Sequence, residues 1–451
     1  MKSIIYIVFI ILMSSCNVYR SFKTPVIKQS AIAGEDIIIS DTLIIQPSWN
    51  IYFADEKLQS LIKESLIANS DLRIARQNIV QAEASLLSAK LSYLPSFAFV
   101  ADGGISKFSN NTSKTYNLPI TTQWEIDLSG RLLNEKRHAQ ALLWQNEEYV
   151  RLIQTQLIAS IANNYYTLIM LDEQLRITVE ATKIRENIIE IMKSLKDVGQ
   201  QTEAAVNQAE VDYYNVKASI SELEFQIVQV QNSLSLLLNK TPQNIQREQI
   251  KNVKLLDNSI SKNISLVALS NRPDIRMAEA ELSSCFYGIN VARSAFYPSL
   301  NLSGSVGWTN NFGEIINPGK LLLSAIGALT QPLFNKGINN TNLKISKSQY
   351  EQSLIRFEKS LLIAGNEVNN ALTDSQKSAQ RIELRIKQIN SAKNAVENTM
   401  DIMKYSSISY LEVLTAQNSL LDAQLLGVYD WFSYMQSNIN LYKSVGGIII
   451  L

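Results

Sequence analysis

The residue types that most often perform catalysis or bind metals are scarce in this chain. It holds one histidine, His138, and two cysteines, Cys16 and Cys285. It contains no Gly-x-x-x-x-Gly-Lys segment for binding phosphates and no Gly-x-Ser-x-Gly elbow for carrying a nucleophile. These residues supply too few soft ligands for zinc or copper. We therefore expect no catalytic site, no metal site, no cofactor and no enzyme activity, with His138 solvated at a polar helix start.

Cys16 follows a typical secretory signal. Residues 1–15 begin with a lysine at the second position, continue as an apolar run, and end in two serines directly before Cys16. Small residues before a cysteine resemble the lipobox of bacterial lipoproteins, in which the signal is cut before the cysteine and the thiol is acylated. The alternative is an ordinary signal peptide with an incidental cysteine. If Cys16 carries lipid, Cys285 has no partner for an intrachain disulfide, and its apolar helical stripe predicts a core position.

Composition excludes some other classes of protein. The 451 residues are 46% apolar, which is enough for a large core, and 42 basic residues balance 41 acidic ones. Because the net charge is only +1, the chain has no electrostatic footprint for nucleic acid. After the signal, no stretch reaches the roughly 18 uncharged apolar residues of a membrane-spanning helix.

Two halves of the chain repeat one pattern of helix, strand, strand and long helix. A shift of 203 positions places Asp71 on Asp274 and Pro95 on Pro298, and a shift of 207 places Val206 on Val413. The period is too long for a solenoid repeat, so it indicates an internal duplication. The predicted organisation is a signal peptide (1–15), a lipid-anchored extended arm (16–54), a first repeat (55–245), a linker (246–270), a second repeat (271–447) and a tail (448–451).

Four segments have the pattern of strands. Apolar and polar residues alternate over 116–128 and 300–309, and weaker strand candidates lie at 97–106 and 322–333. About 13 residues of strand suffice to cross a bilayer at a tilt, but the sheet must then close. Four strands per chain close only by oligomerisation: two chains give eight strands with a filled interior, and three give twelve with an open lumen. A soluble sheet packed on helices remains the alternative.

The remaining sequence predicts long helices. Between Gly130 and Gly199 there is no glycine or proline, and such a helix would extend about 100 Å at ~1.5 Å per residue. Apolar residues over 206–237 then recur at intervals of three and four, which is a coiled-coil seam. The second copy repeats the hairpin, with Asn418 as a polar interruption. A short helix over 56–68 is expected to be capped by Asp55.

Several segments resemble motifs of the TolC-like outer-membrane efflux family, in the family's order and over almost the whole mature chain. Together with the lipobox they indicate its lipoprotein branch. The segments are Trp124-Glu125-Ile126-Asp127-Leu128 with Gly130-Arg131, Arg272-Pro273-Asp274-Ile275-Arg276, Gln331-Pro332-Leu333-Phe334, Tyr410-Leu411-Glu412-Val413-Leu414 with Ala416-Gln417, and Tyr442-Lys443 with Gly446-Gly447.

The resemblance implies a mainly α protein with a small β part. In this fold three chains form a twelve-stranded barrel in the outer membrane, with four transmembrane strands from each chain, and long coiled-coil helices extend into the periplasm. The implied function is a passive, lipid-anchored duct of the cell outer membrane. Its implied partners are two further copies of the chain, outer-membrane lipid, a periplasmic adaptor and an inner-membrane pump of the RND type.

The family gates its periplasmic end with charged residues. Glu397 and Asp401, one helical turn apart, are therefore expected at the entrance, although charges on a helix are usually only solvated. The segment 404–409 lacks the glycine that the family places there, so its turn is expected to differ. The helix tips expected to contact the adaptor carry Val198, Gly199, Tyr405 and Ser406.

A second function stays open on periodicity alone. A lipid-anchored coiled-coil stalk or scaffold of the cell envelope, without a pore, would contain the same helical hairpins. It does not explain the long alternating strands, and it predicts no ion current across a planar bilayer.

Overall fold

The computed structural model describes most of the chain and divides it into two compact units. It covers residues 19, 21–25, 49–109, 111–255, 269–309, 320–405 and 410–447. Unit 1 consists of residues 1–27, 77–149 and 276–360, and unit 2 of residues 28–76, 150–275 and 361–451. Each unit therefore combines segments from both predicted repeats.

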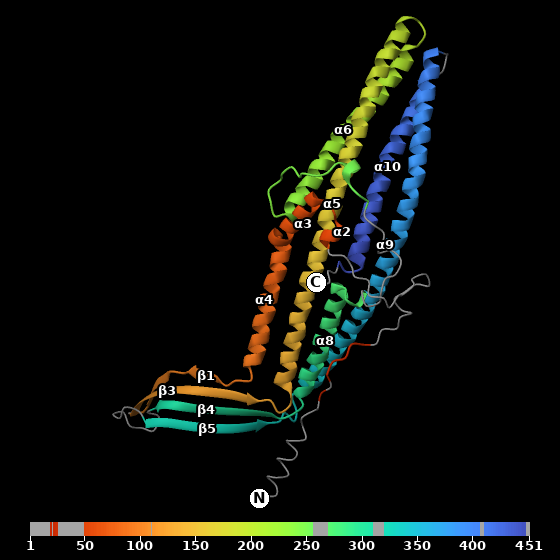
Figure 1. Ribbon diagram of the computed structural model, residues 1–451. Helices are drawn as coiled ribbons and strands as arrows, with labels where there is room; N and C mark the ends of the chain where they lie inside the picture. Colours follow the sequence, from red (N-terminus) through yellow and green to blue (C-terminus); the bar gives the residue numbers. More distant parts are fainter. Residues whose placement is uncertain are drawn as a thin grey trace. The chain divides into compact units, whose positions relative to one another are not determined.

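Unit 1 contains an antiparallel sheet, seen as neighbouring arrows in Figure 1. The order is β1-β3-β4-β5, and β2 also pairs with β3. The strong strand predictions are confirmed, whereas the segment predicted at 97–106 is divided in two and the last strand ends three residues earlier than expected. The strands are β1 (Ser96–Phe99), β2 (Asp102–Phe108), β3 (Asn111–Ile126), β4 (Ser299–Thr309) and β5 (Lys320–Thr330).

The division between β1 and β2 has a local cause. Phe99 pairs with Ile120 and Asp102 pairs with Asn117, so both strands keep one register against β3. Between these pairs the Val100 N–H donates to the Pro119 carbonyl at 3.0 Å. Proline has no N–H to return the bond, and the ladder is therefore interrupted although the strand direction is kept.

The helices of the two halves match in length, which supports the predicted duplication. Helices α4 (Ser70–Leu91) and α8 (Pro273–Ser294) have 22 residues each. Helix α5 (Arg131–Asp197) has 67 residues and α9 (Ile338–Tyr405) has 68. The returning helices α6 (Glu203–Leu237) and α10 (Tyr410–Ser444) have 35 each.

In unit 2 the helices form two coiled hairpins whose turns lie at the same end of the unit (Figure 1). The predicted seam of α6 is buried at Val206, Ala209, Tyr213 and Val216. Near the turns, Leu414 of α10 joins a core cluster with α5 and α6 residues. In unit 1 a separate cluster packs α4 against α5.

Short elements complete unit 2. Helix α3 (Glu56–Ala68) begins after Asp55, whose carboxylate accepts from the N–H groups of Lys57 and Leu58, so the predicted cap is confirmed. Helix α2 (Trp49–Tyr52) precedes it, and the 3₁₀ turn η2 (Ile250–Asn252) follows α6. The Tyr52 ring stacks on Tyr442 of α10. Among the helices that the structure describes, none combines the length and apolar character needed to cross a membrane.

Candidate functional site

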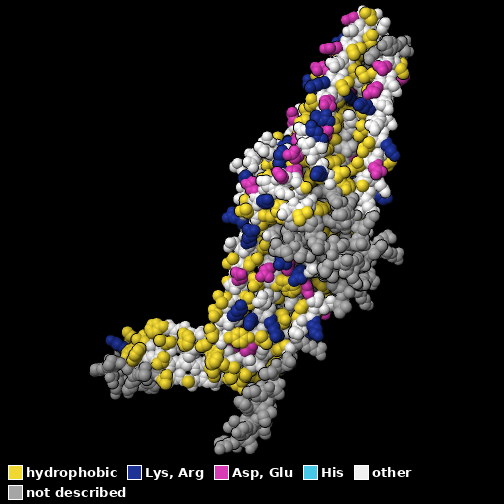
Figure 2. All heavy atoms as spheres, viewed as in Figure 1, with side chains coloured by type: hydrophobic (Ala, Val, Ile, Leu, Met, Phe, Trp, Pro, Cys, Tyr) yellow, Lys and Arg dark blue, Asp and Glu magenta, His cyan; other side chains and the backbone are white. Residues whose placement is uncertain are grey.

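The strand register places large apolar side chains on one face of the sheet. Trp124 lies opposite Leu302, and Val306 of β4 lies opposite both Ile120 and Leu323. Residues directly opposite each other in a sheet share a face. Figure 2 shows hydrophobic side chains gathered over these strands. The apolar members of this face are Phe97, Phe99, Ile105, Leu118, Ile120, Trp124, Ile126, Leu300, Leu302, Val306, Trp308, Leu323 and Leu329.

The opposite face is polar, as the alternation predicted. Among the described residues of this face Ile326 is a large apolar exception, and Pro119 also lies there. Side chains on the apolar face are exposed in the single chain, 79% for Leu323 and 71% for Phe97, so this face requires a cover of lipid or protein. The polar members are Asn117, Thr121, Gln123, Glu125, Asn301, Ser303, Ser305, Thr309, Ser324 and Thr330.

Both edges of the sheet are open within the described part of the chain. One edge is formed by β1 and β2, each paired there only with β3, and the other by β5, paired there only with β4. Unpaired edge strands present rows of N–H and C=O groups that pair readily with another chain. A strand edge in hydrocarbon must be paired, because no water is present to satisfy it.

Gly307 allows β3 and β4 to approach closely. A Cβ atom added there would lie 2.3 Å from the Leu118 carbonyl oxygen and from the Pro119 Cα atom. Both contacts are with backbone, which cannot move aside as a flexible side chain does. A side chain at this position is therefore incompatible with the observed pairing.

The corner where β3 turns into α5 is fixed by polar contacts. Gly130 has φ +70°, in the left-handed region that favours glycine. The next residue, Arg131, forks onto the Glu125 carboxylate, with its Nε 2.9 Å from Oε1, and also bonds Glu135. Asp127 Oδ2 accepts from the Leu133 N–H at 2.9 Å and so caps the helix. A pocket of about 700 Å³ lies beside Trp124 and Arg131.

A hydrogen bond to a main-chain carbonyl occurs at the corresponding place in each repeat, and a different residue donates it in each. Trp124 Nε1 donates to the Tyr93 carbonyl at 2.9 Å, just before the proline that ends the first helical segment. In the second copy, Gln331 Nε2 donates to the Phe296 carbonyl at 3.0 Å. Tyr93 and Phe296 are related by the 203-residue shift, so the acceptor position is the same while the donor has changed.

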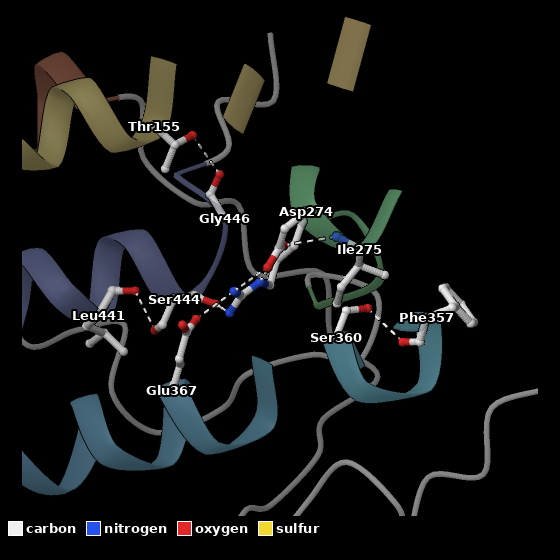
Figure 3. Close-up of polar contacts among 10 residues, drawn as sticks. Thr155, Asp274, Ile275, Phe357, Ser360, Glu367, Leu441, Ser444 and Gly446 are labelled. Atoms are coloured by element: carbon white, nitrogen blue, oxygen red, sulfur yellow. Dashed lines mark hydrogen bonds and ion pairs between the residues drawn. The ribbon is translucent and has the colours of Figure 1, made fainter. Parts of the chain in front are cut away.

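In unit 2, the first residue of the Arg-Pro-Asp motif, Arg272, is buried and bonds residues of three helices. Arg272 is only 4% exposed. Its Nε and Nη2 donate to the two Asp274 oxygens at 3.0 and 2.8 Å, and Nη2 also donates to Glu367 Oε2 at 2.6 Å. Nη1 donates to the Ser444 carbonyl at 2.6 Å, at the end of α10. Figure 3 shows Asp274, Glu367 and Ser444 around this guanidinium group, which joins the start of α8, the middle of α9 and the end of α10.

The first repeat has an uncharged counterpart of this cluster. Asn69, one shift of 203 before Arg272, donates from Nδ2 to the Leu237 carbonyl at 3.0 Å, at the end of α6. Its Oδ1 accepts from the Leu72 N–H and caps α4. Helix α4 begins at Ser70, and the sequence analysis assigned no role to Asn69. Its position directly before the helix was the available signal.

The Gly446-Gly447 motif ends α10. Both glycines have positive φ, and their N–H groups donate to the Lys443 and Tyr442 carbonyls, which closes the helix. Thr155 Oγ1 of α5 donates to the Gly446 carbonyl at 3.3 Å, and the Tyr442 hydroxyl donates to Gly447 (Figure 3 shows the first contact).

A buried polar layer between the hairpins was not predicted. Arg185 of α5 is 3% exposed, and it donates to Asp212 Oδ2 of α6 and to Asn418 Oδ1 of α10, each at 2.6 Å. The neighbouring Gln417 is 6% exposed, and both of its amide atoms lack a partner among the described residues. The polar interruption of the seam at Asn418 was the signal that could have found this layer.

The helix tips expected to contact a partner are partly described. Val198 is 69% exposed directly after α5, and Gly199 adopts φ +74° with open space around it. Tyr405 ends α9, and Ser406 lies outside the described residues. The rest of the second turn, for which a difference from the family is expected, also lies outside the described residues.

The remaining predicted site residues lie far apart in the sequence. Glu397 and Asp401 are both exposed on α9, one turn apart. Cys16 lies outside the described residues. His138 is half-buried rather than solvated, and burial lowers its pKa. Cys285 is only partly buried rather than in the core, and burial raises the pKa of its thiol. No group of acidic, histidine or cysteine side chains suited to a metal occurs among the described residues.

Comparison with known proteins gives a consistent result. The family model described as outer membrane efflux protein matches residues 61–240 and 265–447. The probable outer membrane lipoprotein SilC of Salmonella typhimurium is 26% identical, over 95% of this chain and 94% of its own. The cation efflux system protein CusC of Escherichia coli is 24% identical, over 95% of each chain. The toluene efflux pump outer membrane protein TtgC of Pseudomonas putida is 26% identical, over 97% of this chain and 93% of its own.

Solved structures share the fold. A crystal structure of CusC has a TM-score of 0.86 at 23% identity, covering 96% of this chain and all of that one (100%). The outer-membrane channel OprN has a TM-score of 0.83 at 23% identity, covering 95% and 98% of the two chains. The open-state MtrE channel of Neisseria gonorrhoeae has a TM-score of 0.82 at 25% identity, covering 95% and 97%.

Proposed function

Because this chain belongs to the outer membrane efflux protein family, we propose that three copies assemble into a passive outer-membrane duct that receives cargo from a periplasmic adaptor and an inner-membrane pump. The pump proposed is of the RND type. The names of the relatives include cation and toluene efflux, which fits a duct that transmits whatever its pump selects.

The two-faced sheet with two open edges carries this proposal. Its apolar face suits lipid, its polar face suits water, and edge-to-edge pairing of neighbouring copies satisfies both open edges. Because β1 and β2 follow one another along β3, the sheet is four strands wide, and three copies give a barrel of twelve strand positions. Twelve are enough for a water-filled lumen, whereas the eight of two copies would be filled by side chains. The strand lengths also fit, since β4 and β5 have 11 residues each and a tilted transmembrane strand needs about 9–11.

Two measurements on the purified, detergent-solubilised protein test the assembly. Native mass measurement after chemical cross-linking is expected to show three copies, and the same material is expected to conduct ions across a planar bilayer. Single or paired chains would refute the closed sheet. Three copies without conductance would favour the coiled-coil scaffold instead.

We also propose that the thiol of Cys16 is acylated and anchors the chain to the outer membrane. The signal pattern before Cys16 supports this, and the name of the relative SilC describes that protein as a lipoprotein. Cells grown with labelled palmitate should incorporate the label into the wild-type protein and not into Cys16→Ser. Equal labelling of the two proteins would place the lipid elsewhere, and no label in either would remove the anchor.

The entrance proposal concerns Glu397 and Asp401. Both side chains are exposed one turn apart on α9, which supports the proposal that three copies form a ring of negative charge there. We expect Glu397→Gln with Asp401→Asn to raise single-channel conductance. Glu383→Gln, an exposed carboxylate elsewhere on α9, is the matched control and should leave conductance unchanged. Equal conductance of the double variant and the wild type would reject the gating role.

Contact with the adaptor is proposed at the turns, through Val198, Gly199, Tyr405 and Ser406. Exposed apolar side chains at helix tips suit burial against a partner, and Val198 provides one. Val198→Asp should reduce co-purification of the chain with its adaptor. Val211→Asp, at an exposed valine farther along α6, should not. An equal loss in both variants would reject a tip-specific contact.

A further inference from the structure

The described residues of the N-terminal arm make three contacts along unit 1. Tyr19 packs against Gly130 at the corner between β3 and α5: a Cβ added to this glycine would lie 3.2 Å from the Tyr19 ring. The Phe22 ring contacts Phe286 of α8, with centroids 5.8 Å apart. The Thr24 hydroxyl donates to Glu279 of α8. The arm is therefore bound at three points, and its path follows α8 away from the corner.

The contact of Tyr19 is made by its ring rather than by its hydroxyl. Its hydroxyl oxygen is buried and has no hydrogen-bond partner among the described residues. Burial raises the pKa of Tyr19 to about 12; Tyr297 and Asp127 act in the same direction, and Arg293 opposes them. These neighbours place Tyr19 beside the ends of β3 and α8. An unpaired buried hydroxyl costs free energy, so packing must hold the residue in place.

Exposed aromatic side chains surround the same corner. Trp124, Phe296 and Tyr297 are 40%, 38% and 45% exposed, next to the ends of strands whose outer face is apolar. Aromatic residues concentrate at the boundary between the hydrocarbon and water in membrane proteins. The corner therefore has the composition of the periplasmic membrane boundary, on the proposed function.

We propose that Tyr19, Phe22 and Thr24 form a clamp that holds the lipid-bearing N-terminus at this boundary and protects the tether from proteolysis. Cys16 precedes Tyr19 by three residues, which span at most about 11 Å. The clamp thus keeps the lipid-bearing residue within that distance of the corner. This inference rests on the proposed acylation of Cys16, while the docking of the arm can be tested without it.

Two trypsin sites lie inside the clamp, after Arg20 and Lys23. A protease cleaves a docked segment only when it opens locally, so the initial cleavage rate follows the open population. Phe22→Ala is expected to raise the rate at these two bonds about tenfold, corresponding to ~1.4 kcal/mol of lost packing. Ser21→Ala changes an exposed residue of the same arm and is the matched control. The cut positions are identified by mass spectrometry of the full chain in lipid vesicles.

Variants at Tyr19 separate ring packing from hydrogen bonding. Tyr19→Phe should be cleaved within twofold of the wild-type rate, because the hydroxyl has no partner to lose, whereas Tyr19→Ala should be cleaved several-fold faster. Equal rates for Phe22→Ala and the wild type would overturn the clamp. Equal acceleration in Tyr19→Phe and Tyr19→Ala would also overturn it.

The same assay distinguishes failure of the clamp from failure of the proposed function. Cys16→Ser should keep the wild-type cleavage pattern, because docking depends on the arm and not on the lipid. When both proteins are labelled with palmitate, trypsin should separate the label from the body of Phe22→Ala faster than from the body of the wild type. A wild-type chain that takes up no palmitate removes the anchoring role but not the docking. A chain that conducts ions yet shows no protection refutes only the clamp.

Discussion

Replacing Arg272 by alanine tests whether the Arg-Pro-Asp motif acts by joining helix ends. Arg272 is 4% exposed, and its guanidinium group bonds Asp274, Glu367 and the Ser444 carbonyl. Alanine would leave all three acceptors without this donor. Burial of the carboxylates is incomplete, with the side chain of Asp274 28% exposed and that of Glu367 43%. Water would therefore replace part of the lost interaction.

The structure sets the expected size of the effect. Breaking a fully buried ion pair costs about 3–5 kcal/mol, and losing one neutral hydrogen bond costs about 1 kcal/mol. Because both carboxylates retain access to water, we expect Arg272→Ala to lower the free energy of unfolding by about 2–3 kcal/mol. Arg272→Lys keeps the charge but loses the fork that spans two acceptors, so about half of the effect is expected.

Equilibrium unfolding in guanidinium chloride, followed by far-UV circular dichroism at one fixed protein concentration, measures these changes. Arg73→Ala is the matched control, since Arg73 is an exposed arginine near the start of the corresponding helix α4, and it should change stability by less than about 0.5 kcal/mol. A loss below about 1 kcal/mol in Arg272→Ala would refute the reasoning, because two charge-assisted bonds alone exceed that value. An equal loss in the control would show a non-specific effect.

Three further predictions follow from single contacts. Gly307→Ala should destabilise the assembled protein by about 1–3 kcal/mol in thermal unfolding, because its Cβ would overlap the backbone of β3, whereas Gly327→Ala meets only a flexible side chain and should cost less. Gln417→Leu should raise the denaturation midpoint, since it removes a buried amide that has no described partner, and a lower midpoint would contradict this. Trp124→Phe should cost about 1 kcal/mol in the same assay by leaving the Tyr93 carbonyl without its donor, and an unchanged midpoint would show that water replaces the bond.

The element pattern was predictable because local rules determine it. Asp55 caps α3 as expected, since its carboxylate needs only the two N–H groups that follow it. The absence of glycine and proline between Gly130 and Gly199 predicted a long helix there, and α5 ends two residues before Gly199. The alternation of apolar and polar residues in β3 and β4 predicted one apolar and one polar face of the sheet, because successive side chains of a strand point to opposite faces.

The contacts that hold these elements together were not predictable in the same way. Arg185 reaches Asp212 and Asn418 across 27 and 233 positions, and nothing in the local sequence of α5 names those partners. The interruption between β1 and β2 depends on a proline in the partner strand, not on the strands themselves. Sequence periodicity specifies which face is buried, whereas polar partners depend on the three-dimensional register of helices.

Corresponding hydrogen bonds in the two repeats suggest how the halves diverged while their helices kept the same lengths. At the corner, the donor is Trp124 in one copy and Gln331 in the other, and at the base of the hairpin it is Asn69 in one copy and Arg272 in the other. Each of these four bonds has a main-chain carbonyl as acceptor, and Arg272 adds bonds to the Asp274 and Glu367 carboxylates. Because every residue type supplies a carbonyl, substitution at the acceptor position does not remove the bond, and any side chain with an N–H group of suitable reach can replace the donor. At these four contacts the duplicated fold therefore depends on the position of the backbone acceptor and not on its residue type, which allows the residues to differ between helices that match in length.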